Sequence, residues 1–148
     1  MNVEIKKITA AETRNLRQLI LRPHQNADEL VYEDDDHSDS LHLGAYIVDE
    51  LCGIASLYKH TLKDNTEKET WRLRGMATLE KYRGKGLGII LMNECISHVK
   101  EKNGAIFWCN ARTTAEGFYE KFGMKRNGGV FTPEGLGEHI VMLMNIKK

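Results

Sequence analysis

Residues 83–88 read Arg-Gly-Lys-Gly-Leu-Gly, and they stand between an alternating segment, 70–79, and a segment of helical periodicity, 87–102. The first amides of a helix lack intrahelical partners and carry the positive end of the helix dipole. Glycines let the backbone approach a ligand closely, and Arg83 and Lys85 add positive charge at the same place. The stretch therefore predicts a strand–turn–helix unit that holds a phosphate or pyrophosphate.

The spacing of the glycines excludes two common nucleotide motifs. A Walker A motif needs Ser or Thr directly after Gly-Lys, where this chain has Gly86. The dinucleotide fingerprint needs a third small residue at a position that Ile89 or Leu91 occupies here. The pattern that fits is Arg-x-x-Gly-x-Gly, formed by Arg83, Gly86 and Gly88.

Composition narrows the class of protein. The 148 residues are 41% apolar and 28% charged, with 21 basic and 21 acidic side chains, which gives no overall attraction to nucleic acid or to an anionic membrane. The odd set Cys52, Cys95 and Cys109 lacks CxxC spacing, which argues against a disulfide framework and a zinc site. No apolar run is long enough for a membrane span, and the first residues lack a signal-peptide core. We therefore expect a cytoplasmic protein.

The rest of the chain predicts one mixed α/β domain over residues 1–148. Thr9 is the expected N-cap of a helix over 10–21, and the polar stretch 22–40, with its acidic run at 33–36, is typical of a solvated loop. Thr113 and Glu116 have the spacing of a capping box at the start of a further helix. The other expected elements are strands at 3–8, 41–48, 52–60, 105–109, 125–132 and 138–146, with 49–50 as a hairpin loop. This order indicates an α/β (α+β) fold with one curved, mixed sheet of about six to seven strands and about four helices.

Two blocks of sequence resemble one known family. The stretch 73–88, LRGMATLEKYRGKGLG, is similar to the acetyl-CoA motif of the GCN5-related N-acetyltransferase (GNAT) superfamily. The residues from Asn110 to Met124 resemble its second conserved block. Within the superfamily, residues 41–45 and 137–142 resemble a bacterial branch related to ElaA-type acetyltransferases.

The resemblance implies a binding site for acetyl-CoA as co-substrate, without a metal. The sheet should be mostly antiparallel with splayed central strands, and the amide of Asn110 should hydrogen-bond the pantetheine arm. The backbone of Met76, Ala77 and Thr78 should run beside the same arm. The pyrophosphate should be received by the amides of Arg83, Gly84, Lys85, Gly86, Leu87 and Gly88.

The same resemblance implies candidate catalytic residues. Tyr119 is the candidate general acid for the coenzyme thiolate, with simple packing beside Phe118 and Phe122 as the alternative. His139 is the candidate base, although a histidine on a strand is also a common structural residue. A backbone N–H near Met76 or Ala77 is the expected donor to the thioester oxygen. Further candidate bases are Glu33, His42, Glu69 and Glu80, and a water chain to solvent is a further alternative.

The acceptor is the least determined part. Arg72, Arg74 and Tyr32 are candidate substrate residues, since arginines can pair with a carboxylate or phosphate, but they can also form ion pairs within the sheet. The acidic run would instead favour a cationic amine. We expect acetyl transfer to a primary amine of a small metabolite, with a protein amine or a non-catalytic acyl-CoA sensor as alternatives. An exposed edge strand would give a route to a homodimer, and the sequence leaves the oligomeric state open.

Overall fold

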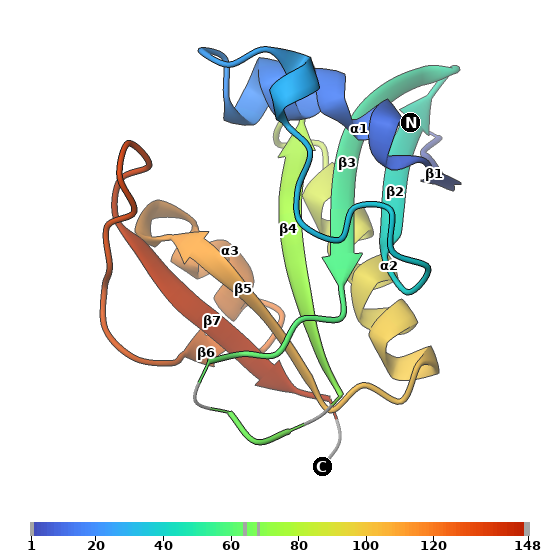
Figure 1. The fold of residues 1–148 in the computed structure, drawn as a ribbon. Helices are drawn as coiled ribbons and strands as arrows, with labels where there is room; N and C mark the ends of the chain where they lie inside the picture. Colours follow the sequence, from blue (N-terminus) through green and yellow to red (C-terminus); the bar gives the residue numbers. More distant parts are fainter. Residues whose placement is uncertain (1, 64, 68, 147–148) are drawn as a thin grey trace. The chain divides into compact units, whose positions relative to one another are not determined.

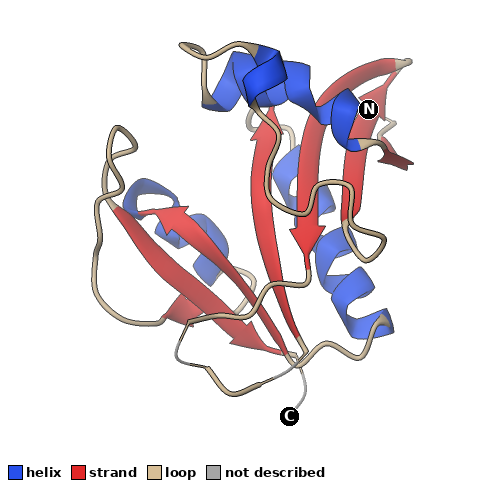
Figure 2. Cartoon of the chain, viewed as in Figure 1, coloured by secondary structure: helices blue, strands red, loops and turns tan. Residues whose placement is uncertain are grey.

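The strands of the described residues form one seven-stranded sheet in the order β1-β2-β3-β4-β5-β7-β6 (Figure 1). The structure is a computed structural model, and it describes residues 2–63, 65–67 and 69–146. The strands are β1 Glu4–Ile8, β2 Leu41–Ile47, β3 Glu50–Tyr58, β4 Thr70–Thr78, β5 Ile106–Arg112, β6 Lys125–Arg126 and β7 His139–Asn145. The α-helices of the described residues are α1 Ala10–Leu16, α2 Leu87–Glu101 and α3 Glu116–Glu120. Short helical turns add Arg17–Leu21, Ala27–Glu29, Glu80–Tyr82 and Thr113–Ala115 (Figure 2). The predicted α/β fold with a mostly antiparallel sheet is therefore confirmed.

The chain is divided into two compact units. The first unit contains the chain up to Tyr58 together with Arg74–His98. The second contains Lys59–Leu73 and the chain from Val99 onward.

In the first unit, α1 begins at the predicted cap. The Thr9 hydroxyl accepts a hydrogen bond from the Glu12 amide at 3.2 Å, and the Glu12 carboxylate accepts one from the Thr9 amide at 2.9 Å. This reciprocal capping box satisfies two amides that the helix itself leaves unpaired. The helix continues into a π-helical turn, Arg17–Leu21, so the helical segment predicted for 10–21 is confirmed.

The β2–β3 hairpin turns one residue earlier than predicted. Ile47 pairs with Glu50, and the turn consists of Val48 and Asp49, with φ angles of 46° and 66°. Two successive positive φ angles are typical of a type I′ hairpin turn, whose twist matches that of the flanking strands. Val48 was predicted as the last residue of the strand 41–48, and β-branched residues do favour strands.

The two longer helices pack on opposite faces of β3. Ile54 belongs to the buried cluster of Leu16 in α1 and Ala77 in β4. Its neighbour Gly53 faces the other way, because a Cβ on Gly53 would lie 3.2 Å from the Leu91 side chain of α2. Successive residues of a strand point to opposite faces, so β3 forms the middle layer of this unit.

In the second unit, β5 is the central strand. The first part of β4 pairs with it in parallel, from Thr70↔Ile106 to Leu73↔Cys109. Strand β7 pairs with its other side in antiparallel register, from Ile106↔Asn145 to Arg112↔His139. The cluster Leu62, Ala105, Ile106 and Trp108 forms a buried core here.

Two predictions for the second unit are wrong in detail. The strand predicted for 125–132 is reduced to Lys125–Arg126 and an isolated bridge between Phe131 and His139. Gly128, with φ of 95°, interrupts extended backbone between the two. The capping box predicted at Thr113 does not form, because a 3₁₀ turn already begins at that residue and Ala115 precedes α3 without a side-chain cap.

Candidate active site

The turn 83–88 leads from β4, through the 3₁₀ turn Glu80–Tyr82, to the first residue of α2. The φ angles of Gly84 and Gly86 are 76° and 85°, and a Cβ at either position would meet nothing within 4 Å. The first backbone bond of the helix runs from the Ile90 amide to the Gly86 carbonyl at 3.1 Å. The amides that precede Ile90 in α2 therefore have no intrahelical partner, and the glycine backbone beside them is open to a ligand.

Contacts within the first unit hold this turn in place. The Leu79 amide donates to the Cys52 carbonyl of β3 at 2.8 Å. The Glu50 carboxylate accepts hydrogen bonds from Lys81 at 3.0 Å and from the Tyr82 hydroxyl at 3.2 Å, and the Lys81 bond lowers the pKa of Glu50. The charge of Lys81 is thus neutralised by the Glu50 carboxylate. The side chains of Arg83 and Lys85, which belong to the turn, are exposed. These residues fit an anionic group such as a pyrophosphate.

Strand β4 changes conformation just before the residues expected to lie beside the pantetheine arm. Gly75 has φ of 67° in the middle of the strand, a conformation that glycine adopts without steric cost. After it, Ala77 is buried, and Met76 and Thr78 are partly exposed. Irregularities of this kind re-aim strand residues and are common next to active sites.

In the second unit, Asn110 lies within β5 opposite Val141, and its side chain is exposed. The strand continues to Arg112, so the prediction that it ends at Cys109 is wrong, and antiparallel pairing with β7 explains the extension. Tyr119 lies in α3 and is partly buried. Its ring meets the Phe118 ring edge-on at a centroid distance of 5.1 Å. Both predicted residues thus have surface available to a ligand.

His139 begins β7 and is 8% exposed. Its Nδ1 lies 3.0 Å from the Gly137 carbonyl oxygen. A carbonyl oxygen only accepts, so the neutral ring carries its proton on Nδ1, and Nε2 is left as a proton acceptor. Two backbone bonds with Phe131, at 2.9 and 2.7 Å, fix the residue.

Comparison with known proteins decides the family. The family model "Acetyltransferase (GNAT) family" matches residues 7–124. The chain belongs to the GNAT family. The uncharacterized N-acetyltransferase YitI of Bacillus subtilis is 38% identical over 145 residues, which cover 98% of this chain and 97% of YitI. The chain is therefore an acetyl-CoA-dependent N-acetyltransferase.

Solved structures share the fold of this acetyltransferase. An aminoglycoside 6'-N-acetyltransferase complexed with coenzyme A superposes with a TM-score of 0.77 at 18% identity, covering 98% of both chains. ElaA of Escherichia coli superposes with a TM-score of 0.76 at 20% identity, covering 96% of this chain and 99% of ElaA. At these identities the likeness concerns the fold alone.

The other candidate bases of the acetyltransferase have different environments. Both ring nitrogens of His42 are engaged, Nδ1 with the Ser56 hydroxyl at 2.7 Å and Nε2 with the Asp35 carbonyl at 2.8 Å. Glu69 lies 3.2 Å from Lys59, and Glu33 and Glu80 are exposed. His42 is therefore part of the folded core, where it does not have a nitrogen free for catalysis.

Arg17 and Asp35 form a buried ion pair that the sequence patterns did not predict. Arg17 is fully buried and Asp35 is 4% exposed, and their two hydrogen bonds measure 2.7 and 3.0 Å. Arg17 also donates to the Leu30 carbonyl at 2.9 Å and to the hydroxyls of Ser56 and Tyr58 at 3.1 Å each. Burial by itself would lower the pKa of Arg17, but the Asp35 carboxylate raises it above its usual value. The prediction of a fully solvated acidic run is thus wrong at Asp35.

Arginines also stack on the aromatic rings of the acetyltransferase. The Tyr32 ring lies between the guanidinium carbons of Arg17 and Arg74, each 3.9 Å from its centroid. In the second unit, Arg72 lies 5.2 Å from the centroid of the Trp108 ring. The candidate substrate residues thus fall into two groups: Tyr32 with Arg74 in the first unit, and Arg72 with Trp108 in the second.

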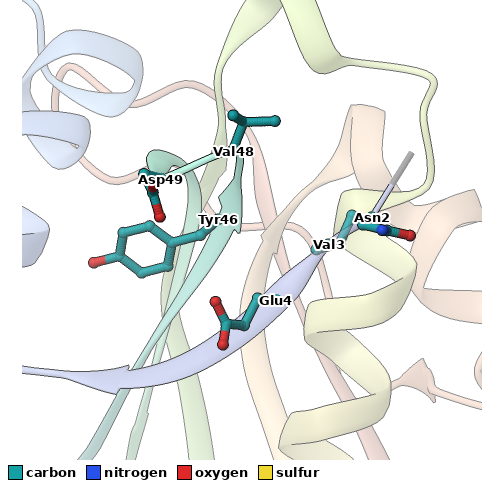
Figure 3. Close-up of a pocket in the computed structure, with 6 residues that line it drawn as sticks. All are labelled: Asn2, Val3, Glu4, Tyr46, Val48 and Asp49. Carbon is teal, nitrogen blue, oxygen red and sulfur yellow. The ribbon is translucent and has the colours of Figure 1, made fainter.

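Figure 3 shows a surface pocket elsewhere in the first unit. It is lined by Asn2, Val3, Glu4, Tyr46, Val48 and Asp49, none of which belongs to the predicted coenzyme site. Among the described residues, no group of three or more His, Cys, Asp and Glu side chains is arranged to hold a metal ion. No helix within the described ranges has the length and apolarity to cross a membrane.

Proposed function

We propose that this acetyltransferase, acting as a single domain over residues 1–148, moves the acetyl group of acetyl-CoA directly to a primary amine of a small metabolite. The observation that carries the proposal is the turn 83–88. Its unpaired helix amides, its two open glycines and the exposed Arg83 and Lys85 together suit the pyrophosphate of the coenzyme.

Further residues would hold the rest of the coenzyme. The backbone of Met76, Ala77 and Thr78 follows the irregular Gly75 and would accompany the pantetheine arm. The exposed amide of Asn110 would hydrogen-bond the same arm. A backbone N–H of Met76 or Ala77 would stabilise the carbonyl oxygen as its negative charge develops.

The transfer needs a proton acceptor and a proton donor. An alkyl amine has an unperturbed pKa near ~10.4, so it must lose a proton before or as it attacks. Nε2 of His139 would take this proton, since Nδ1 is occupied by the Gly137 carbonyl. The new C–N bond forms as the C–S bond breaks, and the Tyr119 hydroxyl would donate its hydrogen to the departing sulfur.

The cysteines of the chain favour direct transfer over an acyl-cysteine intermediate. Burial raises the pKa of Cys95 to about 12 and that of Cys109 to about 12. Burial also raises the pKa of Cys52, which is fully buried. The thiolate is the nucleophilic form of cysteine, and a buried thiol with a raised pKa is protonated at neutral pH.

A thiol-release assay with acetyl-CoA and a panel of small amines tests the proposal. We expect amine-dependent release of coenzyme A, and a fall in kcat on the order of 10²-fold for Tyr119→Phe and for His139→Gln. Lys102→Gln, an exposed substitution after α2, is the control and should keep full activity. Release with a peptide amine alone would assign a protein acceptor, and binding of acetyl-CoA without release for any amine would refute the proposal.

A further inference from the structure

We propose that Arg74, ordered by stacking on Tyr32, binds a carboxylate of the acceptor, so that the acceptor is an amine that also carries a carboxylate, such as an amino acid. This inference rests on the proposed function for the location of the amine. Its three residues, Arg17, Tyr32 and Arg74, all belong to the first unit.

The Tyr32 ring is held from two sides. Arg17 and Arg74 lie over it, each with its guanidinium carbon 3.9 Å from the ring centroid. Gly75 lies next to the ring, because a Cβ on Gly75 would lie 3.2 Å from Cε2 of Tyr32 and 3.6 Å from Nε of Arg17. The absence of a side chain at Gly75 therefore lets the ring and the buried arginine approach β4 closely.

The two arginines differ in their partners. Arg17 is neutralised by Asp35 and makes further hydrogen bonds to Leu30, Ser56 and Tyr58. Arg74 is partly exposed, and among the described residues no salt bridge joins it to a carboxylate. The cluster thus contains one compensated charge and one uncompensated charge, which is that of Arg74.

Stacking prepares Arg74 for a planar anion. A guanidinium that lies over a ring uses its face for the contact and keeps the N–H groups at its edge available. These N–H groups form a rigid fork that matches the two oxygens of a carboxylate. Because the ring already restricts the side chain, less rotamer freedom is lost when the anion binds.

Arg74 lies on β4 close to the residues that are proposed to bind the thioester oxygen. Arg74 and Met76 flank the irregular Gly75, so their Cα atoms lie at most about 7 Å apart, the reach of two extended residues. The proposed oxygen donor is the backbone N–H of Met76 or Ala77. A carboxylate on Arg74 would therefore place a nearby amine of the same molecule within reach of the thioester.

Matched acceptors give the direct test. Initial rates are measured with α-amino acids and with their carboxamides, which keep the amine but lack the negative charge. We expect the amino acids to be preferred, and Arg74→Gln to lower kcat/KM for them by on the order of tenfold to hundredfold, mainly through KM. The carboxamide rates should fall much less, because only the charge-assisted part of the interaction is missing for them, and the KM for acetyl-CoA should stay unchanged. Arg74→Lys should retain part of the preference for the carboxylate. The control variant Lys102→Gln should retain all of it.

Tyr32→Leu tests the stacking itself. It keeps Arg74 but removes the ring that orders it, so the preference for the carboxylate should fall while the carboxamide rates persist. A variant that merely disturbs the fold would lower both rates together, and the Tm of each variant checks this. Equal losses for both acceptor types in Arg74→Gln, or a wild-type preference for carboxamides, would overturn the inference.

A binding measurement separates this inference from the proposed function. N-acetyl amino acids and N-acetyl amino-acid amides are titrated into the protein saturated with coenzyme A, and the Tm is followed. Stabilisation by the carboxylates that Arg74→Gln abolishes supports the inference even if no small amine is acetylated, a result that would refute the proposed function alone. Equal stabilisation of wild type and Arg74→Gln would refute the inference alone.

Discussion

Replacing Asp35 by Asn tests how strongly the buried ion pair stabilises the first unit. The Asp35 carboxylate accepts hydrogen bonds from Arg17 at 2.7 and 3.0 Å, from the Tyr32 amide at 2.9 Å and from the Tyr58 hydroxyl. Asn is nearly isosteric but neutral, so the fully buried guanidinium of Arg17 would lose its counter-charge. Removing one partner of a buried pair costs about 3–5 kcal/mol, mostly because the remaining charge stays desolvated.

This free energy corresponds to a large shift in Tm. For a chain of 148 residues, an unfolding entropy of about 2.1 cal/mol/K per residue gives about 0.3 kcal/mol/K, so Tm should fall by about 10–16 °C. Thermal unfolding followed by circular dichroism measures the shift. The exposed neighbour offers a matched control, and Asp36→Asn should change the unfolding free energy by less than about 0.5 kcal/mol.

A double-mutant cycle separates the ion pair from loss of shape. Arg17→Met combined with Asp35→Leu removes both charges, and this variant should be more stable than either single variant. Additive losses in the cycle, or a loss below about 1 kcal/mol for Asp35→Asn, would refute the reasoning that burial makes the pair interdependent.

Two further predictions concern the first unit. Burial alone would raise the pKa of Asp35, but hydrogen bonds from Arg17 and Tyr58 outweigh it, and the pKa lies below its usual value. The folded state then binds fewer protons than the unfolded state, so this contribution to stability is complete above about pH 5 and is lost as pH falls through the folded-state pKa. Acid titrations of Tm should be flatter for Asp35→Asn, and parallel curves would contradict this. Val48 has φ of 46° and is 91% exposed. Val48→Asn should stabilise the fold by about 1 kcal/mol in urea unfolding, while Val130→Asn in an exposed loop should not.

The local features of the fold could be predicted from sequence. The cap at Thr9, the helix after Gly86 and the turn that precedes it all depend on residues within a few positions of one another. Patterns of this range are visible in a single sequence because the hydrogen bonds are local. The same reasoning predicted the glycine turn that leads into α2, and the binding of the coenzyme by this turn stays a prediction.

The ion pair between Arg17 and Asp35 could not be predicted in this way. Its members come from the end of the first helical segment and from an acidic run, and both patterns are typical of solvated surface. Side-chain partners of the pair on β2 and β3 are His42, Ser56 and Tyr58. The sequence does show that Ser56 and Tyr58 lie two positions apart in the predicted strand 52–60, so both side chains are expected on the same face of the sheet.

The capping prediction at Thr113 was wrong for a related reason. The Thr-x-x-Glu pattern was complete, but the Thr113 amide instead donates to the Glu138 carbonyl at 3.1 Å. Glu116 hydrogen-bonds Arg126 at 2.8 Å, so its side chain does not return to the helix start. The Thr113 amide and the Glu116 carboxylate, which would have paired in the local motif, thus both bond to residues farther along the chain.

The parallel register between Thr70–Leu73 and Ile106–Cys109 has a consequence for how the chain folds. The β2–β3 hairpin closes through a two-residue turn, so its strands can pair through contacts between residues that are close in the sequence. The β4–β5 pair can form only after the chain has passed through the glycine turn and the whole of α2, and closing so long a loop is slow. The two strands that meet in the second unit are therefore expected to pair late in folding, after α2 has already formed.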